Sequence, residues 1–461
     1  MRAPLCPRLG FFIWGMLYTL NRKQEALYFM DKLFKLKERG TTVGTEVIAG
    51  ITTFLTMVYI VIVNPGILSE AGMDFHGVFI ATVLASVTAT LIMGLFSNYP
   101  IVLAPGMGLN AYFAYTVVGG SGFSWQVALG AVFIGGVLFV LLSLTPFRYM
   151  LLDAIPSSLK HAITAGIGLF ITFIGLQNAK IIVDSPATLL TLGDLTQPMT
   201  LLTVVGLIIS LILMAYRVKG FLFIGMLITG IIAYFTGQLH MPDSIVSLPS
   251  GLNATAFQLD IGSVFTQGLY SVIFTFLLIT LFDTTGTMLG VAEQAGLLKD
   301  NKFPRSQGAL LADAVGTSVG ALLGTSPTSA YIESSAGVAV GGRTGLTAVV
   351  VSILLAITLF FSPIISVLAS IPAITAPALI IVGFLMLNVL RKIDWSDLEE
   401  AFPAFLIVVL MPLTYSIATG IGIGFIVYPV LKLVRGKAKD VHPIFYLFAV
   451  LFFIQIVFFS H

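Results

Sequence analysis

Two acidic side chains stand out because the residues around them carry no charge. Asp283 follows nine uncharged residues in FTFLLITLFDTTGTMLG, and Glu333 lies in the otherwise uncharged run SPTSAYIESSAGVAVGG. A carboxylate at the centre of a bilayer costs roughly 2.5–3.5 kcal/mol on insertion scales, so such residues usually bind a ligand, a cation or a proton. We predict a joint ligand site at these two acids. The alternative is that each carboxylate accepts hydrogen bonds at the end of a broken helix.

The chemistry of these acids favours one kind of ligand. A carboxylate accepts N–H hydrogen bonds, and the central segments hold no arginine that would attract an anion, since Arg343 lies at the end of its segment. A neutral, planar ligand with several N–H groups is therefore favoured over sulfate or a carboxylate. A buried carboxyl group can also exchange a proton, so Glu333 and Asp283 are predicted to couple transport to a proton gradient.

Neighbouring side chains complete the predicted site. Phe282 and Tyr331 flank the acids and can stack on a flat ring, although an aromatic residue in a membrane helix more often only packs. Asp313, in GALLADAVGTSVG, is a weaker candidate that fits helix packing or gating. The polar residues predicted to contact the ligand are Asn110, Thr284 and Ser334.

Two broken apolar segments must position these residues. Segments 98–118 and 324–345 each carry a small residue followed by proline, with a polar residue, Asn110 or Glu333, five or six positions further on. We predict a short extended stretch and then a half-helix, whose free N–H groups meet a ligand in a cavity. The alternative is a pair of proline-kinked helices. The backbone positions expected at the cavity are Pro105, Gly106, Gly108, Pro327 and Thr328.

The surrounding elements are predicted to be membrane helices. Hydrophobic residues make up 57% of the chain and charged residues 10%, and the mean hydropathy is +1.02; soluble domains carry about 25% charged residues. This predicts an all-α polytopic membrane protein with about 14 transmembrane segments. The run 443–460 either crosses the membrane or lies at its interface. The other expected spans are 44–64, 76–97, 123–145, 160–178, 200–216, 220–238, 264–288, 307–324, 344–362, 372–390, 402–417 and 419–434.

Lysine and arginine residues indicate the orientation. They cluster just after Met30 and in alternate loops, whereas the opposite loops carry aspartates such as Asp184 and Asp243. Because positive loops stay inside, the N-terminus is predicted to be cytoplasmic, with the chain in the cell membrane. Residues 30–43 are expected to form an amphipathic cytoplasmic start. We expect residues 1–29 to be an extension ahead of the true initiator Met30, with a short interfacial helix as the alternative.

Other functional classes find little support in the sequence. The formal net charge of +2 does not indicate a nucleic-acid partner. Cys6 is the single cysteine and the five histidines are scattered, so no metal site and no cofactor are predicted. The chain shows no Ser/Lys pair or metal-binding set at membrane depth, so we do not expect an enzyme.

Several motifs resemble those of one transporter family. They are RGTTVGTEVIAGITTFLTMVYIVIVNP at 39–65, LAPGMGLNAYFAY at 103–115, LFDTTGT at 281–287 and AYIESSAGVAVGGRTGLTAVV at 330–350. From Met30 onwards the chain is similar to the AzgA-like purine permease branch of the nucleobase–ascorbate / nucleobase–cation symporter superfamily. Two further motifs look more like its bacterial guanine/hypoxanthine permeases, namely GLFITFIGLQ at 168–177 and GKAKDVHPIFY at 436–446.

The resemblance implies both architecture and roles. It implies two inverted repeats of seven segments, at 44–238 and 264–460, with a core domain (spans 1–4 and 8–11), a gate domain (spans 5–7 and 12–14) and a short strand in the broken third and tenth segments. It also implies that Asp283 and Glu333 bind a purine nucleobase, with Asn110 a further essential polar group. Import by proton symport, an elevator-like motion of core against gate, and a homodimer are further implications. The alternatives are an adenine-selective permease, an anion transporter of the same fold and a passive channel.

Overall fold

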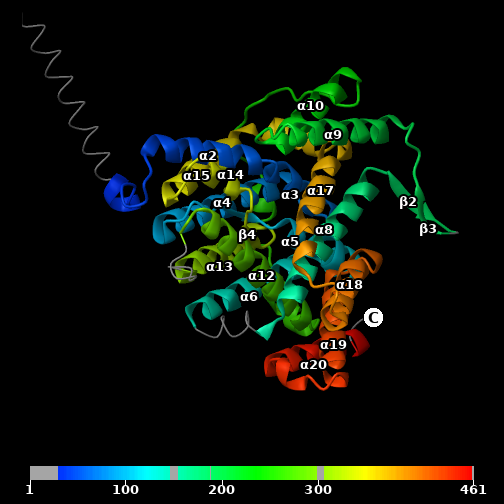
Figure 1. Cartoon of the computed structure of the whole chain (residues 1–461). Helices are drawn as coiled ribbons and strands as arrows, with labels where there is room; N and C mark the ends of the chain where they lie inside the picture. Colours follow the sequence, from blue (N-terminus) through cyan, green and yellow to red (C-terminus); the bar gives the residue numbers. More distant parts are fainter. Residues whose placement is uncertain (1–29, 146–153, 187, 298–305, 459–461) are drawn as a thin grey trace, which may run out of the picture.

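The structure is a computed structural model, and it describes residues 30–145, 154–186, 188–297 and 306–458. Helices dominate these residues, and nine of the helices described are long and apolar enough to cross a membrane. The predicted all-α polytopic membrane protein is therefore confirmed. Residues 1–29, which the sequence predicts to be an extension, lie outside the described residues (Figure 1).

Helices of the first half begin where a side chain or a proline satisfies the first turn. Thr42 accepts a hydrogen bond from the N–H of Thr45 at the start of α2, and Asp74 accepts one from Gly77 at the start of α4. Pro198 opens α9, where its missing N–H costs no bond. The helices of this half are α2 (Val43–Met57), α3 (Ile60–Glu70), α4 (Phe75–Ile92), α5 (Met107–Ala111), α6 (Trp125–Leu144), α8 (Ser157–Asn178), α9 (Pro198–Ala215) and α10 (Phe221–Phe235), with π-helical turns at Met93–Ser97 and Tyr112–Gly120.

Side-chain caps recur in the second half, at the starts of α11, α15, α18 and α19. The long helix α12 continues through Gly286 and Gly290, because a glycine costs a helix only about 1 kcal/mol. The helices are α11 (Ile261–Thr266), α12 (Tyr270–Gln294), α13 (Ser306–Leu323), α14 (Ser334–Ala339), α15 (Gly345–Thr358), α16 (Ser362–Ala369), α17 (Pro372–Met386), α18 (Leu398–Leu413), α19 (Ile417–Val434) and α20 (Pro443–Phe458). Short 3-10 turns lie at Leu252–Ala254, Leu359–Phe361, Leu387–Lys392 and Ala438–Asp440.

Two short strands join the halves of the chain. The strands described are β1 (Leu103–Pro105), β2 (Ile182–Ser185), β3 (Leu189–Leu192) and β4 (Thr328–Ala330). β1 and β4 pair antiparallel with Ala104 opposite Ser329, and all their residues are buried. The predicted strands in the two broken segments are therefore confirmed. β2 and β3 form a separate hairpin in the loop before α9, which the sequence did not predict.

The helices pack in two groups. In the first, α13 packs against α4 and α6, α15 packs against α2 and α4, and α12 packs against α6 and β4. In the second, α8 packs against α17 and α18, α9 packs against α10 and α17, and α19 packs against α18 and α20. Figure 1 shows the first group around β4, with α8, α17 and α18 of the second group beside it. Both paired strands and both candidate acids belong to the first group.

A pair of glycines allows α15 to cross the turn after α4. A Cβ atom on Gly345 would lie 1.8 Å from the carbonyl oxygen of Gly94, so the two backbones meet directly. The next residue after that turn, Asn98, has a left-handed φ of 56°. Its side-chain oxygen accepts a hydrogen bond from the N–H of Gly345 at 2.7 Å. This crossing fixes the start of α15 and, through the preceding loop, the end of α14.

One helix begins earlier than predicted. The span expected at 402–417 is α18, which starts at Leu398 and so includes Glu399. Glu399 is only 1% exposed and pairs with Lys432 and Lys437, each at 2.9 Å. Charges that pair can be buried together. The expected span at 402–417 left Glu399 outside the helix.

Candidate functional site

Glu333 lies in the turn between β4 and α14, and the first span holds it. Its Oε1 accepts a hydrogen bond from the hydroxyl of Tyr59 at 2.7 Å. Tyr59 occupies the break between α2 and α3 and is 1% exposed. Thr56, just before it, donates to the backbone carbonyl of Glu333 at 3.4 Å. Glu333 as a whole residue is partly exposed.

Asp283 lies in the middle of α12 and bonds to β4. Its Oδ2 accepts a hydrogen bond from the hydroxyl of Ser329 at 2.5 Å. Ser329 is the central residue of β4, opposite Ala104 in β1, so the strand pair fixes this donor. Asp283 is also partly exposed. Each candidate acid thus receives one side-chain hydroxyl and keeps part of its surface open.

Asp313 has a different environment from the other two acids. It is fully buried in α13, and both of its oxygens are bonded. Thr284 of α12 donates to Oδ2 at 2.6 Å, and Thr328 of β4 donates to Oδ1 at 2.7 Å. Asp313 therefore ties α12, α13 and β4 together. Thr284, predicted as a ligand contact, is fully buried and donates to Asp313.

Asn110 lies in a separate buried polar cluster. Its Oδ1 accepts a hydrogen bond from the hydroxyl of Ser326 at 2.5 Å, and the same hydroxyl oxygen lies 3.3 Å from Oδ1 of Asn64. The amide of Asn64 in turn donates to two threonine hydroxyls. The Nδ2 of Asn110 has no hydrogen-bond partner among the described residues. The cluster joins the first span to both broken segments, and the hydrogen bonds described do not connect it to the two acids.

Some backbone groups expected to face a ligand are already bonded. The N–H of Gly106 donates to the carbonyl of Pro327 at 3.0 Å and so extends the ladder between β1 and β4. The N–H of Thr328 donates to the hydroxyl of Thr317 in α13 at 3.1 Å. These two N–H groups are therefore not free to meet a ligand, because strand pairing and a neighbouring hydroxyl satisfy them.

Tyr331 and Ser334 bind the backbone of the first broken segment at both ends of β1. Tyr331 donates its N–H to the carbonyl of Val102 at 3.0 Å and its hydroxyl to the carbonyl of Pro105 at 2.6 Å. The hydroxyl of Ser334 accepts the N–H of Val102 at 3.0 Å. Both side chains are buried. The polar groups of both residues thus serve the backbone of the first broken segment.

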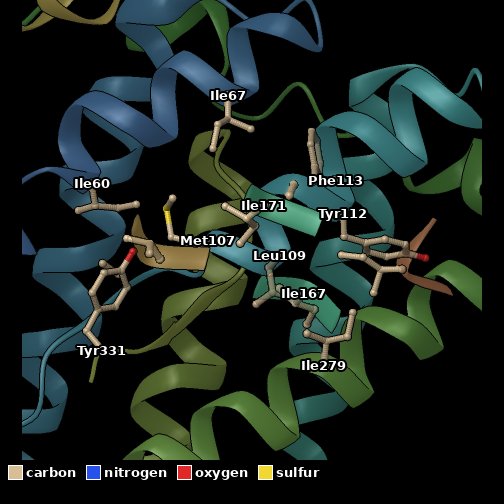
Figure 2. Close-up of a cluster of buried hydrophobic side chains, with 14 of the residues drawn as sticks. Ile60, Ile67, Met107, Leu109, Tyr112, Phe113, Ile167, Ile171, Ile279 and Tyr331 are labelled. Carbon is tan, nitrogen blue, oxygen red and sulfur yellow. The ribbon is translucent and has the colours of Figure 1, made fainter. Parts of the chain in front are cut away.

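Apolar side chains surround the short helix α5. A Cβ atom on Gly108 would lie 2.4 Å from Cγ2 of Ile167, so glycine lets α5 approach α8 closely. Figure 2 shows Leu109 with Ile167 and Ile279 in this buried cluster. Phe282 belongs to the same core and is 8% exposed. Buried apolar side chains therefore support the first broken segment next to the strand pair.

The sequence did not identify the two hydroxyl groups that bind the acids. Tyr59 lies 274 positions from Glu333, and a tyrosine in an apolar helix has no local signature that separates bonding from packing. Ser329 lies among other small polar residues in TSPTSAY. The only signal for Ser329 was its place in a broken segment, where strand pairing aligns alternate side chains.

Replacing Asp313 with alanine is expected to lower the melting temperature of the purified protein by several degrees. The change removes the carboxyl acceptor of two buried hydroxyl groups. Thr328 keeps the backbone carbonyl of residue 313 at 3.0 Å, whereas Thr284 keeps only the hydroxyl of Ser329 at 3.3 Å, and a poorly satisfied buried hydroxyl costs about 1–3 kcal/mol. Asp313→Asn keeps one acceptor oxygen and should lose less. Thermal denaturation in detergent measures both, with Asp194→Ala in an exposed loop as the control. An Asp313→Ala variant with the same melting temperature as the unmodified protein would contradict the scaffold role.

The fold and the site together define a class of protein. Multi-pass helices surround a pair of broken segments, and two partly exposed carboxylates lie beside them. Broken helices that bring polar groups into the membrane interior are the arrangement by which transporters bind a small polar solute. The molecule is a membrane transporter by this architecture.

Comparison with known proteins identifies the family. The chain belongs to the Permease family, which it matches over residues 44–423, and the resemblance to nucleobase–cation symporters is confirmed. It is 56% identical over 429 residues to the guanine/hypoxanthine permease PbuO of Bacillus subtilis, covering 92% of this chain and 99% of that one. It is 46% identical over 430 residues to the adenine permease AdeP of Escherichia coli, covering 93% and 96%.

A solved structure shares the fold at low sequence identity. The transmembrane domain of the cyanobacterial bicarbonate transporter BicA aligns with a TM-score of 0.63 at 14% identity. The match covers 80% of this chain and 95% of that domain. At this identity the likeness shows the fold alone.

Proposed function

We propose that this protein imports purine nucleobases, with guanine and hypoxanthine as the preferred substrates. The observation that carries the proposal is the pair of partly exposed acids, Asp283 and Glu333, each held by a single hydroxyl. Purines present N–H groups at their ring edges, and carboxylates are strong acceptors for such donors. The similarity to a guanine/hypoxanthine permease over nearly the full length of both chains supports this choice of base.

In this proposal the two acids orient the base. Asp283 and Glu333 accept N–H bonds from the purine, while Tyr331 and Phe282 supply the aromatic wall of the site. Among the buried side-chain donors of the two broken segments, the Nδ2 of Asn110 is the one without a hydrogen-bond partner. It therefore offers a hydrogen bond to an acceptor atom on the base. A purine that accepts this bond would relieve an unsatisfied buried donor, which costs about 1–3 kcal/mol.

Transport in this proposal is proton symport with a moving core. Glu333 and Asp283 carry the proton, and the group of helices around β1 and β4 moves as a core against a gate made by α8–α10 and α17–α19. Residues 44–238 and 264–460 form the two inverted repeats. The N-terminus is cytoplasmic, the protein resides in the cell membrane as a homodimer through the gate, and it performs no enzymatic reaction.

Uptake of radiolabelled bases in a strain without nucleobase transport tests the proposal. Cells expressing this chain should accumulate hypoxanthine and guanine but not uracil, and a protonophore should abolish the accumulation. Adenine is the base to compare, because the chain is also similar to an adenine permease. Preferential adenine uptake would replace the guanine/hypoxanthine assignment. No uptake of any base would refute nucleobase transport.

A further inference from the structure

The hydroxyl of Tyr59 is committed to Glu333. It donates to Oε1 at 2.7 Å, and this is the hydrogen bond that the structure gives to the Tyr59 side chain. A hydrogen bond to a charged acceptor is among the strong ones, and it fixes direction as well as distance. The plane of the Glu333 carboxylate is thereby set by a residue of the first span.

Tyr59 cannot follow a moving carboxylate, because its ring is locked in the core. It is 1% exposed and lies among fully buried neighbours in the break between α2 and α3. A close-packed interior resists reorientation of a ring of this size. Thr56, in the last turn of α2, donates to the backbone carbonyl of Glu333 as well. Glu333 is thus held at Oε1 by Tyr59 and at its backbone carbonyl by Thr56, and Oε2 is the carboxylate oxygen to which no described side chain donates.

Asp283 is held in the same manner, by a hydroxyl group from the second half of the chain. Its Oδ2 takes the hydroxyl of Ser329, and that hydroxyl oxygen also lies 3.3 Å from the hydroxyl of Thr284. Asp283 therefore also has one oxygen committed to the protein and one, Oδ1, remaining. Each of the two acids therefore has one oxygen without a side-chain donor among the described residues. Neither carboxylate has both oxygens available to the ligand.

We propose that Tyr59 is a positioning residue that makes Glu333 accept one N–H from the ligand, and so makes the site indifferent to the exocyclic amine of guanine. The inference rests on the proposed function and specifies which purines that site accepts. A carboxylate with both oxygens available can bind a fork of two parallel N–H groups. Guanine offers such a fork through its ring N–H and adjacent amine, whereas hypoxanthine offers the ring N–H alone. With Oε1 engaged by Tyr59, both bases use a single N–H.

Tyr59→Phe tests the proposal, because it removes the hydroxyl and keeps the ring. Without the Tyr59 hydroxyl, the Glu333 carboxylate can rotate and accept two parallel N–H groups, one at each oxygen. The KM for hypoxanthine should rise about tenfold, because the base loses a pre-oriented charged acceptor, while the KM for guanine should stay level or fall. The maximal rate should change little for either base. A loss of packing alone would lower expression or the maximal rate. It would not change the KM for hypoxanthine and the KM for guanine by different factors.

Tyr112→Phe is the matched control. Tyr112 is also 1% exposed, and its ring packs edge-on against Phe276 rather than bonding an acid. Both KM values should be unchanged in this variant, and thermal denaturation should show that both variants fold. Equal KM changes for the two bases in Tyr59→Phe, or no change, would overturn the proposal.

A competition measurement on the unmodified protein tests the same idea without a substitution. Guanine and hypoxanthine should inhibit each other's uptake with inhibition constants within about threefold, since each uses one N–H at Glu333. A preference for guanine of more than about tenfold would show that its amine is bound and would overturn the proposal. Failure of the unmodified protein to take up any base would instead refute the proposed function.

Discussion

Glu333→Gln is expected to abolish nucleobase uptake while the protein still reaches the membrane. Glutamine has the same shape and can still accept the hydroxyl of Tyr59 through its one oxygen. The amide NH2 would then occupy the position that faces the ligand, so a donor would meet the N–H of the base. Loss of a charged hydrogen bond and the new mismatch together should reduce uptake at least about 100-fold.

Asp283→Asn is expected to have the same effect for the same reason, because Ser329 would retain the one acceptor oxygen. Membrane abundance and melting temperature check that both variants fold, and Asp194→Asn in an exposed loop is the matched control. Initial rates of hypoxanthine and guanine uptake are the measurement. Normal uptake by either variant would mean that its carboxylate is structural, which is the alternative that the sequence left open.

Gly345→Ala is expected to prevent accumulation of folded protein. The new Cβ would lie 1.8 Å from the carbonyl oxygen of Gly94 and 2.6 Å from its carbonyl carbon. Both are backbone atoms, so no side chain can rotate away, and α15 would have to shift outward. Overpacking of a buried contact costs about 1–3 kcal/mol even where side chains adjust, and here the hydrogen bond from Gly345 to Asn98 would be lost as well.

Gly290→Ala is the control for that experiment. Gly290 lies inside α12, and a Cβ there meets no atom within 4 Å. Alanine is the better helix former, so this variant should be as stable as the unmodified protein or slightly more stable. Size-exclusion profiles of the two variants in detergent measure the amount of folded protein. A normal profile for Gly345→Ala would show that the crossing of α15 is looser than the structure indicates.

Local properties of the sequence determined the class of protein and much of the site. Composition alone required a membrane protein, because so few charged residues cannot cover a soluble surface. Pro105 and Pro327, each in an apolar run rich in small residues, predicted the broken segments, since proline removes an N–H wherever it occurs. The isolated charges of Asp283 and Glu333 identified them as candidates, because an acid in an apolar segment is costly in any fold.

Tertiary structure alone decided how these groups are used. The sequence placed Asp283 and Glu333 in the candidate site but did not reveal that Tyr59 and Ser329 donate to them across 274 and 46 positions. It also grouped Asn110 and Thr284 with the acids, and only the structure shows that Ser326 donates to Asn110 and that Thr284 donates to Asp313. The physical reason is that charge and backbone breaks are properties of single residues and short runs. A hydrogen bond depends on distance and direction between atoms that only packing brings together.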